Sequence, residues 1–322
     1  MILKAFLGDP AVKAEILDRV RKGLEERQIV PIAYLKWSNE GQFASLSGTV
    51  GKTHDPVEFV ANTGLSVELA LLCETLINAG ITFEQDEAAP MGFVMQADDA
   101  VWSFGTQWLE AIDVGQDVSS VVRRFMPVFL AHILAEDFAA SEMISPAVRA
   151  VANEILSLWT CEARGEAVAA KAWRQVRASA LRASDENRGL EGYATADLVE
   201  SLPWPSDGIA AEFPAIFQKF LLSYQQALAA GLMTNEERDE WGQSLDADRQ
   251  LNQLRSEPQY SVMPEEDLMG LFPELEQKIL AVQTPAAEAR IDLAMQQARA
   301  EMVPFLRQQM DGLLELLKDK PD

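Results

Sequence analysis

Apolar residues recur at helical spacing along most of this 322-residue chain. The first predicted helix opens with Asp9 and Pro10, a cap and first-turn pair, and apolar residues then follow at intervals of four from Val12 to Leu24. The same periodicity predicts further helices over 65–79, 99–112, 117–137, 145–160, 165–184, 212–230, 234–254, 264–282 and 285–318. The chain is therefore expected to be mainly α-helical.

Two of the predicted helices contain an interior proline. Such a proline removes a hydrogen bond and clashes with the preceding turn, so we expect Pro127 to kink or split its helix and Pro304 to bend the last one. The residues after Pro304 form one apolar stripe, composed of Leu306, Met310, Leu313 and Leu317. We interpret the stripe as core packing, with a dimer seam or a groove for a partner helix as the alternative.

Two short segments near the N-terminus alternate as strands do. Residues 29–35 and 43–50 are separated by the polar run SNEGQ, and together they predict a small β-hairpin. Residues 80–98 have neither period and are expected to form a loop. The predicted fold is thus an irregular multi-helix array with one small N-terminal β-hairpin.

A domain boundary is indicated by the run LPWPSDG at 202–208. Its two prolines bracket Trp204, and a helix does not readily continue through them. We therefore expect an N-terminal helical domain over 1–202, which contains the hairpin, and a C-terminal helical bundle over 203–322.

The charge balance narrows the classes of function. Fifty acidic side chains stand against 27 basic ones, which gives a formal net charge of −23. Nucleic acid and anionic membranes attract a basic face, so this balance argues against direct binding to either. No window approaches the roughly 20 apolar residues of a membrane helix, and the N-terminal apolar run is too short for a signal peptide. We expect a cytoplasmic protein.

The acidic residues are unevenly distributed. Between residues 51 and 122, twelve acidic side chains occur with Lys52 as the one basic residue. A second stretch, 185–248, has thirteen acidic residues and three basic ones. Such clustering repels nucleic acid and steers basic partners toward the surface, although an acidic surface can also serve solubility alone.

No catalytic or cofactor motif is complete. The run SGTVGKT at 47–53 ends like a phosphate-binding loop, but that motif needs its first glycine at Leu46, and Gly48 comes two residues too late. His132 and Glu136 lie one helical turn apart, yet a carboxylate-bridged metal site needs several such pairs on facing helices. We predict no catalytic residue, no metal site and no cofactor.

The two cysteines, Cys73 and Cys161, cannot build a disulfide framework. Cys73 lies inside the apolar run LALLC, which is typical of a small buried residue. A pairing of Cys73 with the distant His132 for nucleophilic catalysis stays open.

Several segments between residues 6 and 184 resemble one protein family. They are FLGDPAVKAEILDRV, LSVELALLCETLINAG, WLEAIDVGQDVSSVVRRF, AVRAVANEILSLW and AKAWRQVRASALRAS, and the C-terminal LLELLKD resembles the closing helix of the same family. In these segments the chain is similar to a recurrent family of uncharacterised bacterial and phage-associated proteins. The resemblance covers about half of the chain and implies no known activity.

Family members often carry a GC-x-x-GC-x-x-H segment where this chain has GQFASLSGTV at 41–50. Both cysteines of that segment are absent here. Any thiol or metal role that the segment has in relatives is therefore lost, and no functional residue carries over.

The leading hypothesis is a non-enzymatic acidic protein that binds a protein partner with a basic surface, as a nucleic-acid mimic or an anti-defence inhibitor does. The candidate partner-binding residues are Asp86, Glu87, Asp98 and Asp99, because one long loop can present them together. One alternative is a hydrolase-type enzyme whose site combines carboxylates with His132. The other is a structural protein that self-associates through the C-terminal stripe. The oligomeric state is left open.

Overall fold

The computed structural model of the chain describes residues 3–31, 34–37, 43–86, 88–89, 92–138, 141, 144–187, 193–205 and 213–319. Its elements, in chain order, are η1 (Ala5–Gly8), α1 (Pro10–Glu25), α2 (Leu46–Gly51), α3 (Pro56–Thr63), α4 (Val67–Gly80), β1 (Thr82–Gln85), β2 (Phe93–Gln96), α5 (Asp99–Ala111), α6 (Val121–Leu134), α7 (Pro146–Ala163), α8 (Ala170–Glu186), α9 (Tyr193–Ser201), α10 (Phe213–Gly231), α11 (Asn235–Arg255), α12 (Glu265–Leu271), α13 (Pro273–Ala281) and α14 (Pro285–Lys318). The prediction of a mainly α-helical array with a small β-hairpin is confirmed.

Local capping chemistry sets where many of the helices begin. Asp9, Asp55 and Asp98 each accept a hydrogen bond from a backbone N–H in the first turn of α1, α3 and α5, respectively. Thr234 and Glu237 form a reciprocal capping box at the start of α11. These side chains satisfy donors that have no partner within the helix, so the helix starts can be predicted from the sequence.

The two segments expected to pair near the N-terminus do not form a hairpin within the described residues. Leu46–Gly51 form α2 instead, and the pairing that remains is one isolated parallel bridge between Ile29 and Ala44. The Ser45 hydroxyl accepts a 3.0 Å hydrogen bond from the Gly48 backbone N–H, and such a local cap competes with strand pairing. The predicted position of the hairpin is therefore wrong.

The hairpin lies in the segment that was expected to be a loop. Strands β1 and β2 pair antiparallel, in a register that runs from Thr82 opposite Gln96 to Gln85 opposite Phe93. The ring of Phe93 meets that of Phe83 edge to face at 4.9 Å between centroids, a diagonal cross-strand contact that stabilises the pair. Strands of only four residues are too short for their alternation to be distinguished from a loop.

The interior prolines do not divide their helices. Pro127 lies inside α6 and Pro304 inside α14, and each remains one helix. A mid-helix proline costs about 3 kcal/mol, but buried side chains flank both positions, among them Met126 and Phe129 in α6 and Phe305 in α14. Tertiary packing therefore offsets the local cost.

A proline does divide the helix expected over 264–282. Phe272 ends α12 and Pro273 begins α13. Proline suits the first position of a helix and restricts the residue before it to extended conformations. The Phe272–Pro273 pair thus ends one helix, α12, and begins the next, α13.

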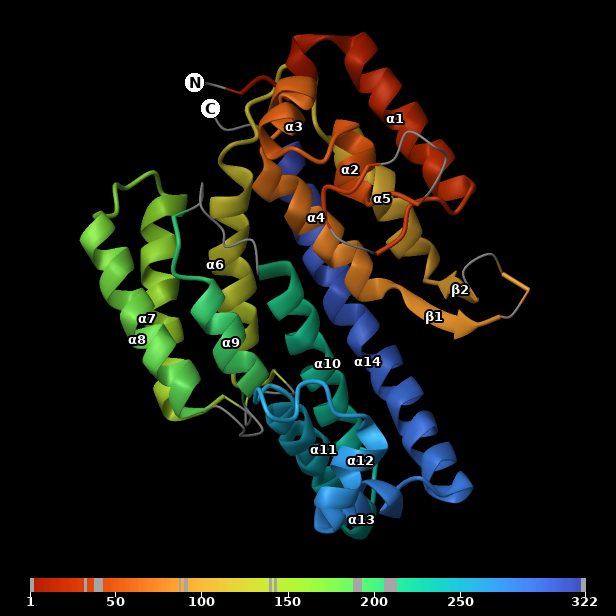
Figure 1. Cartoon of the computed structure of the whole chain (residues 1–322). Coiled ribbons are helices and arrows are strands. Elements are labelled where there is room, and N and C mark those ends of the chain that lie inside the picture. The colour runs from red at the N-terminus through yellow and green to blue at the C-terminus, as the bar shows by residue number, and fades with distance from the viewer. Residues whose placement is uncertain are drawn as a thin grey trace.

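The long helix α14 runs through most of the length of the molecule (Figure 1) and packs against α4, α5, α6 and α10. One buried apolar cluster extends from Ala5 and Phe6 near the N-terminus to Leu313 and Leu317 in α14. Helices on both sides of residue 202 contribute to this cluster. The division into two domains at residue 202 stays a prediction.

The predicted C-terminal stripe belongs to this core. Leu306 and Met310 are 2% and 3% exposed, and Leu313 and Leu317 are fully buried. The interpretation as core packing is confirmed, and the stripe has no free face with which to form a dimer seam.

Helices α11, α12 and α13 gather at the end of the molecule opposite α1 and α3, as Figure 1 shows. Helix α13 packs on α11 and on α12. Trp241 of α11 meets α10 and α14 in a second, much smaller buried cluster with Ala229, Ala294 and Ala298. We call residues 235–281 the distal lobe. Its small core leaves much of its surface facing solvent.

Candidate interaction surface

The four acidic residues chosen from the sequence lie around the hairpin. Asp86 follows β1 at the tip, where its carboxylate accepts a 2.9 Å hydrogen bond from the Ala88 backbone N–H. Asp98 and Asp99 follow β2 at the base, as the cap and first residue of α5. Glu87 lies outside the described residues.

The hairpin separates these carboxylates. Asp86 and Asp98 lie beyond opposite ends of a four-residue strand pair, and at about 3.4 Å per residue this places them well over 10 Å apart. Asp98 also forms an ion pair with Arg307 of α14. Hydrogen bonds from the Ala100 backbone N–H and from Arg307 lower the pKa of Asp98, so its charge is held in place by the fold.

His132 has surroundings unlike those of a catalytic base. Its ring packs against Phe305 at 5.1 Å and Phe138 at 5.9 Å between centroids. Its Nδ1 is 2.9 Å from the side-chain amide of Gln309, which is itself buried. An amide partner among aromatic rings counts against the carboxylate–histidine site of the enzyme alternative. Within the described ranges, no group of three or more His, Cys, Asp or Glu side chains could hold a metal ion.

Most of the run that resembles a phosphate loop lies in the short helix α2, and the first backbone N–H groups of this helix already have hydrogen-bond acceptors. The N–H groups of Leu46 and Ser47 donate to the carboxylate of Glu74, at 3.2 and 3.0 Å. A phosphate-binding loop would need these donors free for its ligand. Glu74 is fully buried, and this burial raises its pKa to about 7, against the hydrogen bonds from Ser47 and Leu46 that lower it.

Cys73, beside Glu74 on α4, is fully buried. Burial raises the pKa of its thiol well above the ordinary value. Because the thiolate is the nucleophile, this burial counts against a catalytic pairing of Cys73 with His132.

The distal lobe combines a strong negative charge with few basic side chains. Residues 235–281 contain twelve acidic and four basic residues. Two of the four basic side chains are neutralised inside the lobe, because Arg249 pairs with Asp246 and Arg255 with Glu265. The potential around the lobe is therefore negative.

The same lobe exposes large apolar side chains. In the described part of the chain, eleven such side chains are exposed. Three of them, Val262, Leu271 and Leu280, lie in the lobe, with Leu232 shortly before it in the chain and Leu293 after it. Helix α13 buries none of its residues. Exposed apolar surface favours an interaction site.

A groove of about 610 Å³ lies where the C-terminal half of α11 faces the junction of α12 and α13. Its apolar lining consists of Leu254, Leu271, Phe272, Pro273 and Leu275. Its polar lining consists of Gln250, Gln253, Glu257 and Glu274. A lining that combines apolar side chains with carboxylates complements a partner surface that combines apolar and basic side chains.

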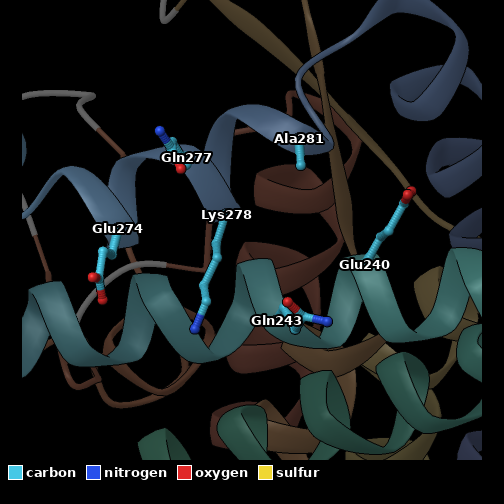
Figure 2. A pocket seen from close by; sticks show the side chains of 6 residues that line it. All are labelled: Glu240, Gln243, Glu274, Gln277, Lys278 and Ala281. Atoms are coloured by element: carbon cyan, nitrogen blue, oxygen red, sulfur yellow. The ribbon is translucent and has the colours of Figure 1, made fainter.

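A second hollow of about 360 Å³ continues between α11 and α13 (Figure 2). It shares Glu274 with the groove, and apart from Ala281 its lining is polar, with Glu240 at the end away from Glu274. Lys278 reaches from α13 toward α11 (Figure 2). We call the two neighbouring hollows along the α11–α13 pair the lobe groove.

Sequence reasoning did not select any residue of the lobe groove. The second acidic stretch, 185–248, was recognised from its charge, but no residue within 250–281 was selected. The one local signal was Phe272–Pro273, which divides the predicted helix and creates the junction that the groove needs.

The chain matches no protein family, no curated protein and no solved structure. The resemblance to uncharacterised bacterial and phage-associated proteins stays a hypothesis. Of the helices that the structure describes, none alone has the length and apolar character to cross a membrane. Helices α3 and α4 have that length and apolar character only when they are taken together, and a bend of 98° separates them.

Proposed function

We propose that this is a non-enzymatic protein that binds a basic protein partner, and that the lobe groove is the binding surface. The occupant is an amphipathic helical segment of the partner, apolar on one side and rich in Lys or Arg along its edges. The observation that carries the proposal is a groove whose lining combines apolar side chains with the carboxylates of Glu257 and Glu274.

Charge and shape act together in this proposal. The negative potential of the lobe attracts a basic segment from a distance. The apolar side chains of the groove then supply contact area, with Leu271, which is 56% exposed, as an anchor. A partner that handles nucleic acid has such basic segments, so the nucleic-acid mimic and the anti-defence inhibitor are specific forms of the proposal, in a cytoplasmic setting.

The acidic residues at the hairpin form a second candidate surface for the same class of partner. Asp86 and Asp99 present carboxylates at its tip and base, and Glu87 and Asp98 complete the set chosen from the sequence. Reversal of all four charges tests this surface separately. It weakens binding of the basic partner if the hairpin takes part and leaves binding unchanged if the lobe groove acts alone.

A labelled synthetic peptide of about 18 residues, with leucines on one helical face and lysines on the other, is a suitable probe. Its affinity is measured by fluorescence anisotropy with Leu271→Ser and with the control Leu181→Ser, which alters an equally apolar, 48% exposed residue on α8. We expect Leu271→Ser to weaken binding about tenfold and Leu181→Ser to have no effect.

Charge reversal distinguishes binding at the lobe groove from general attraction to the net negative charge of the protein. We expect Glu257→Lys with Glu274→Lys to weaken binding more than Glu154→Lys with Glu186→Lys, which makes the same change of charge on α7 and α8. The difference should shrink between about 50 and about 500 mM NaCl because salt screens exposed charges. Equal losses in both pairs, or an unaffected Leu271→Ser variant, would contradict the proposal.

A second copy of this chain is the competing occupant. Analytical ultracentrifugation decides between them: a dimer that dissociates in Leu271→Ser would assign the lobe groove to self-association and overturn the proposal of a basic partner.

A further inference from the structure

Arg299 is a half-buried cation in a protein of strongly negative charge. Its Nη2 donates a 3.0 Å hydrogen bond to the carbonyl oxygen of Gly80, the last residue of α4. In the described parts of the chain it has no carboxylate partner, and burial, with no opposing acidic group, lowers its pKa. Among the described residues, one hydrogen-bond acceptor thus serves a group with five N–H donors.

Arg299 lines a pocket of about 200 Å³ between α14, the base of the hairpin and the start of α5. The pocket wall is mostly apolar and includes Val101, Met302, Val303 and Leu306. A mostly apolar cavity with a few convergent polar groups is the usual form of a small-molecule site.

The charges around this pocket differ in sign from those of the whole protein. Arg299 and Arg307 both line it, eight residues apart on α14, and Asp98 is the one carboxylate in its lining. Asp98 is already paired with Arg307. The pocket thus has two guanidinium groups and one carboxylate, a net positive site in a protein whose net charge is −23.

We propose that this pocket binds a small organic anion with an apolar body, such as a medium-chain carboxylate. The carboxylate of the ligand accepts hydrogen bonds from the free N–H groups of Arg299, which match its geometry in a bidentate pair. The apolar body lies against Val101, Met302 and Leu306. Binding would supply the missing counter-charge to Arg299.

Octanoate is the probe, and its binding to the full chain is measured by isothermal titration calorimetry. We expect Arg299→Gln to weaken octanoate binding at least about tenfold, because it removes the charged partner. The control Arg290→Gln removes the same charge from an exposed position of α14, where Arg290 pairs with Glu237, and should leave the affinity unchanged.

Two further measurements keep the proposal open to refutation if Arg299→Gln disturbs the fold. Val303→Trp fills the pocket without altering Arg299 and should also abolish binding, while circular dichroism confirms the helical content. Octanol, which has the same apolar chain without the charge, should bind at least about tenfold more weakly than octanoate. Absence of octanoate binding to the unmodified protein, equal binding of octanol, or an equal loss in Arg290→Gln would overturn the proposal.

Discussion

The carboxylate of Glu74 on α4 accepts a 3.0 Å hydrogen bond from the backbone N–H of Ser47 at the start of α2, with both residues fully buried. This bond joins two segments that are 27 residues apart in the chain. It also explains why residues 46–51 are helical, since the carboxylate satisfies donors at the helix start that strand pairing would otherwise use.

Stability should fall between about pH 5 and about pH 8 because of Glu74. Its pKa rises from the ordinary value of 4.5 to about 7 on folding, so in this range the unfolded chain is ionised while the folded protein still holds a proton. Folding then takes up a proton, which becomes costlier as the pH rises. We expect a loss of about 2 kcal/mol in the free energy of unfolding across this range, and none once the pH is well above 7.

Urea denaturation of the wild type and of Glu74→Gln at both pH values measures this effect. Glutamine does not titrate, so the variant should lose less stability between the two pH values, by about 2 kcal/mol. Parallel pH profiles for the two proteins would show that Glu74 has no such raised pKa.

The close contact at Gly64 should make this position intolerant of a side chain. Gly64 has φ of +67°, and a Cβ atom there would lie 2.0 Å from the carbonyl oxygen of Lys4. Gly92 has a similar φ of +73° but open space around it. We expect Gly92→Ala to cost about 1 kcal/mol for the positive φ alone, and Gly64→Ala to cost at least about 2 kcal/mol more because backbone must move.

Chemical denaturation of both glycine variants tests this expectation. The two substitutions change the unfolded chain in the same way, so their difference isolates the contact with Lys4. Equal costs would mean that the N-terminal segment moves away freely.

Two buried tryptophans should respond differently to replacement by phenylalanine. The indole N–H of Trp159 donates a 2.9 Å hydrogen bond to the carbonyl of Leu202. That of Trp108 is buried and finds no acceptor among the described residues. Trp159→Phe removes one of two hydrogen bonds to the Leu202 carbonyl, which keeps the one from the Trp204 backbone N–H. Trp108→Phe removes a buried donor that has no such bond. Trp159→Phe should therefore cost about 1 kcal/mol more than Trp108→Phe, as measured by urea unfolding. A larger loss for Trp108→Phe would contradict this account.

Leucines on the same helix should also differ in what they contribute. Leu313 on α14 is fully buried, whereas Leu293 on the same helix is 55% exposed. We expect Leu313→Ala to cost about 2–5 kcal/mol through lost contacts and a cavity, and Leu293→Ala to cost about 0.5 kcal/mol or less. Thermal unfolding of both variants checks this, and similar shifts in Tm would show that the end of α14 is loosely packed.

Helix positions were predictable because the signals that set them are local. Asp9 with Pro10, and Thr284 with Pro285, act on their own first turns, and α1 and α14 begin where these pairs predict. The position of the hairpin was not predictable. The segments 29–35 and 43–50 are short, and Leu46 and Ser47 donate hydrogen bonds to Glu74, which lies far away in the sequence. The segment that does pair, 82–96, was predicted to be a loop because each of its strands has only four residues.

For the candidate sites, the sequence predicted only the excess of acidic residues, not how their side chains are arranged. The acidic excess was evident from the sequence, but Asp98 could not be seen to pair with Arg307, 209 residues away. Nor could the junction at Phe272 and Pro273 be seen to open a groove, because a groove is a property of two facing helices.

By itself the sequence determined the net charge, the helical class of the fold and most helix starts, because these depend on residue type and on neighbours a few positions away. Tertiary structure alone decided which apolar side chains are covered. Leu313 and Leu271 look alike in the sequence, yet one is buried in the core and the other is 56% exposed beside the lobe groove. Burial depends on what packs against a side chain, and that partner comes from elsewhere in the chain.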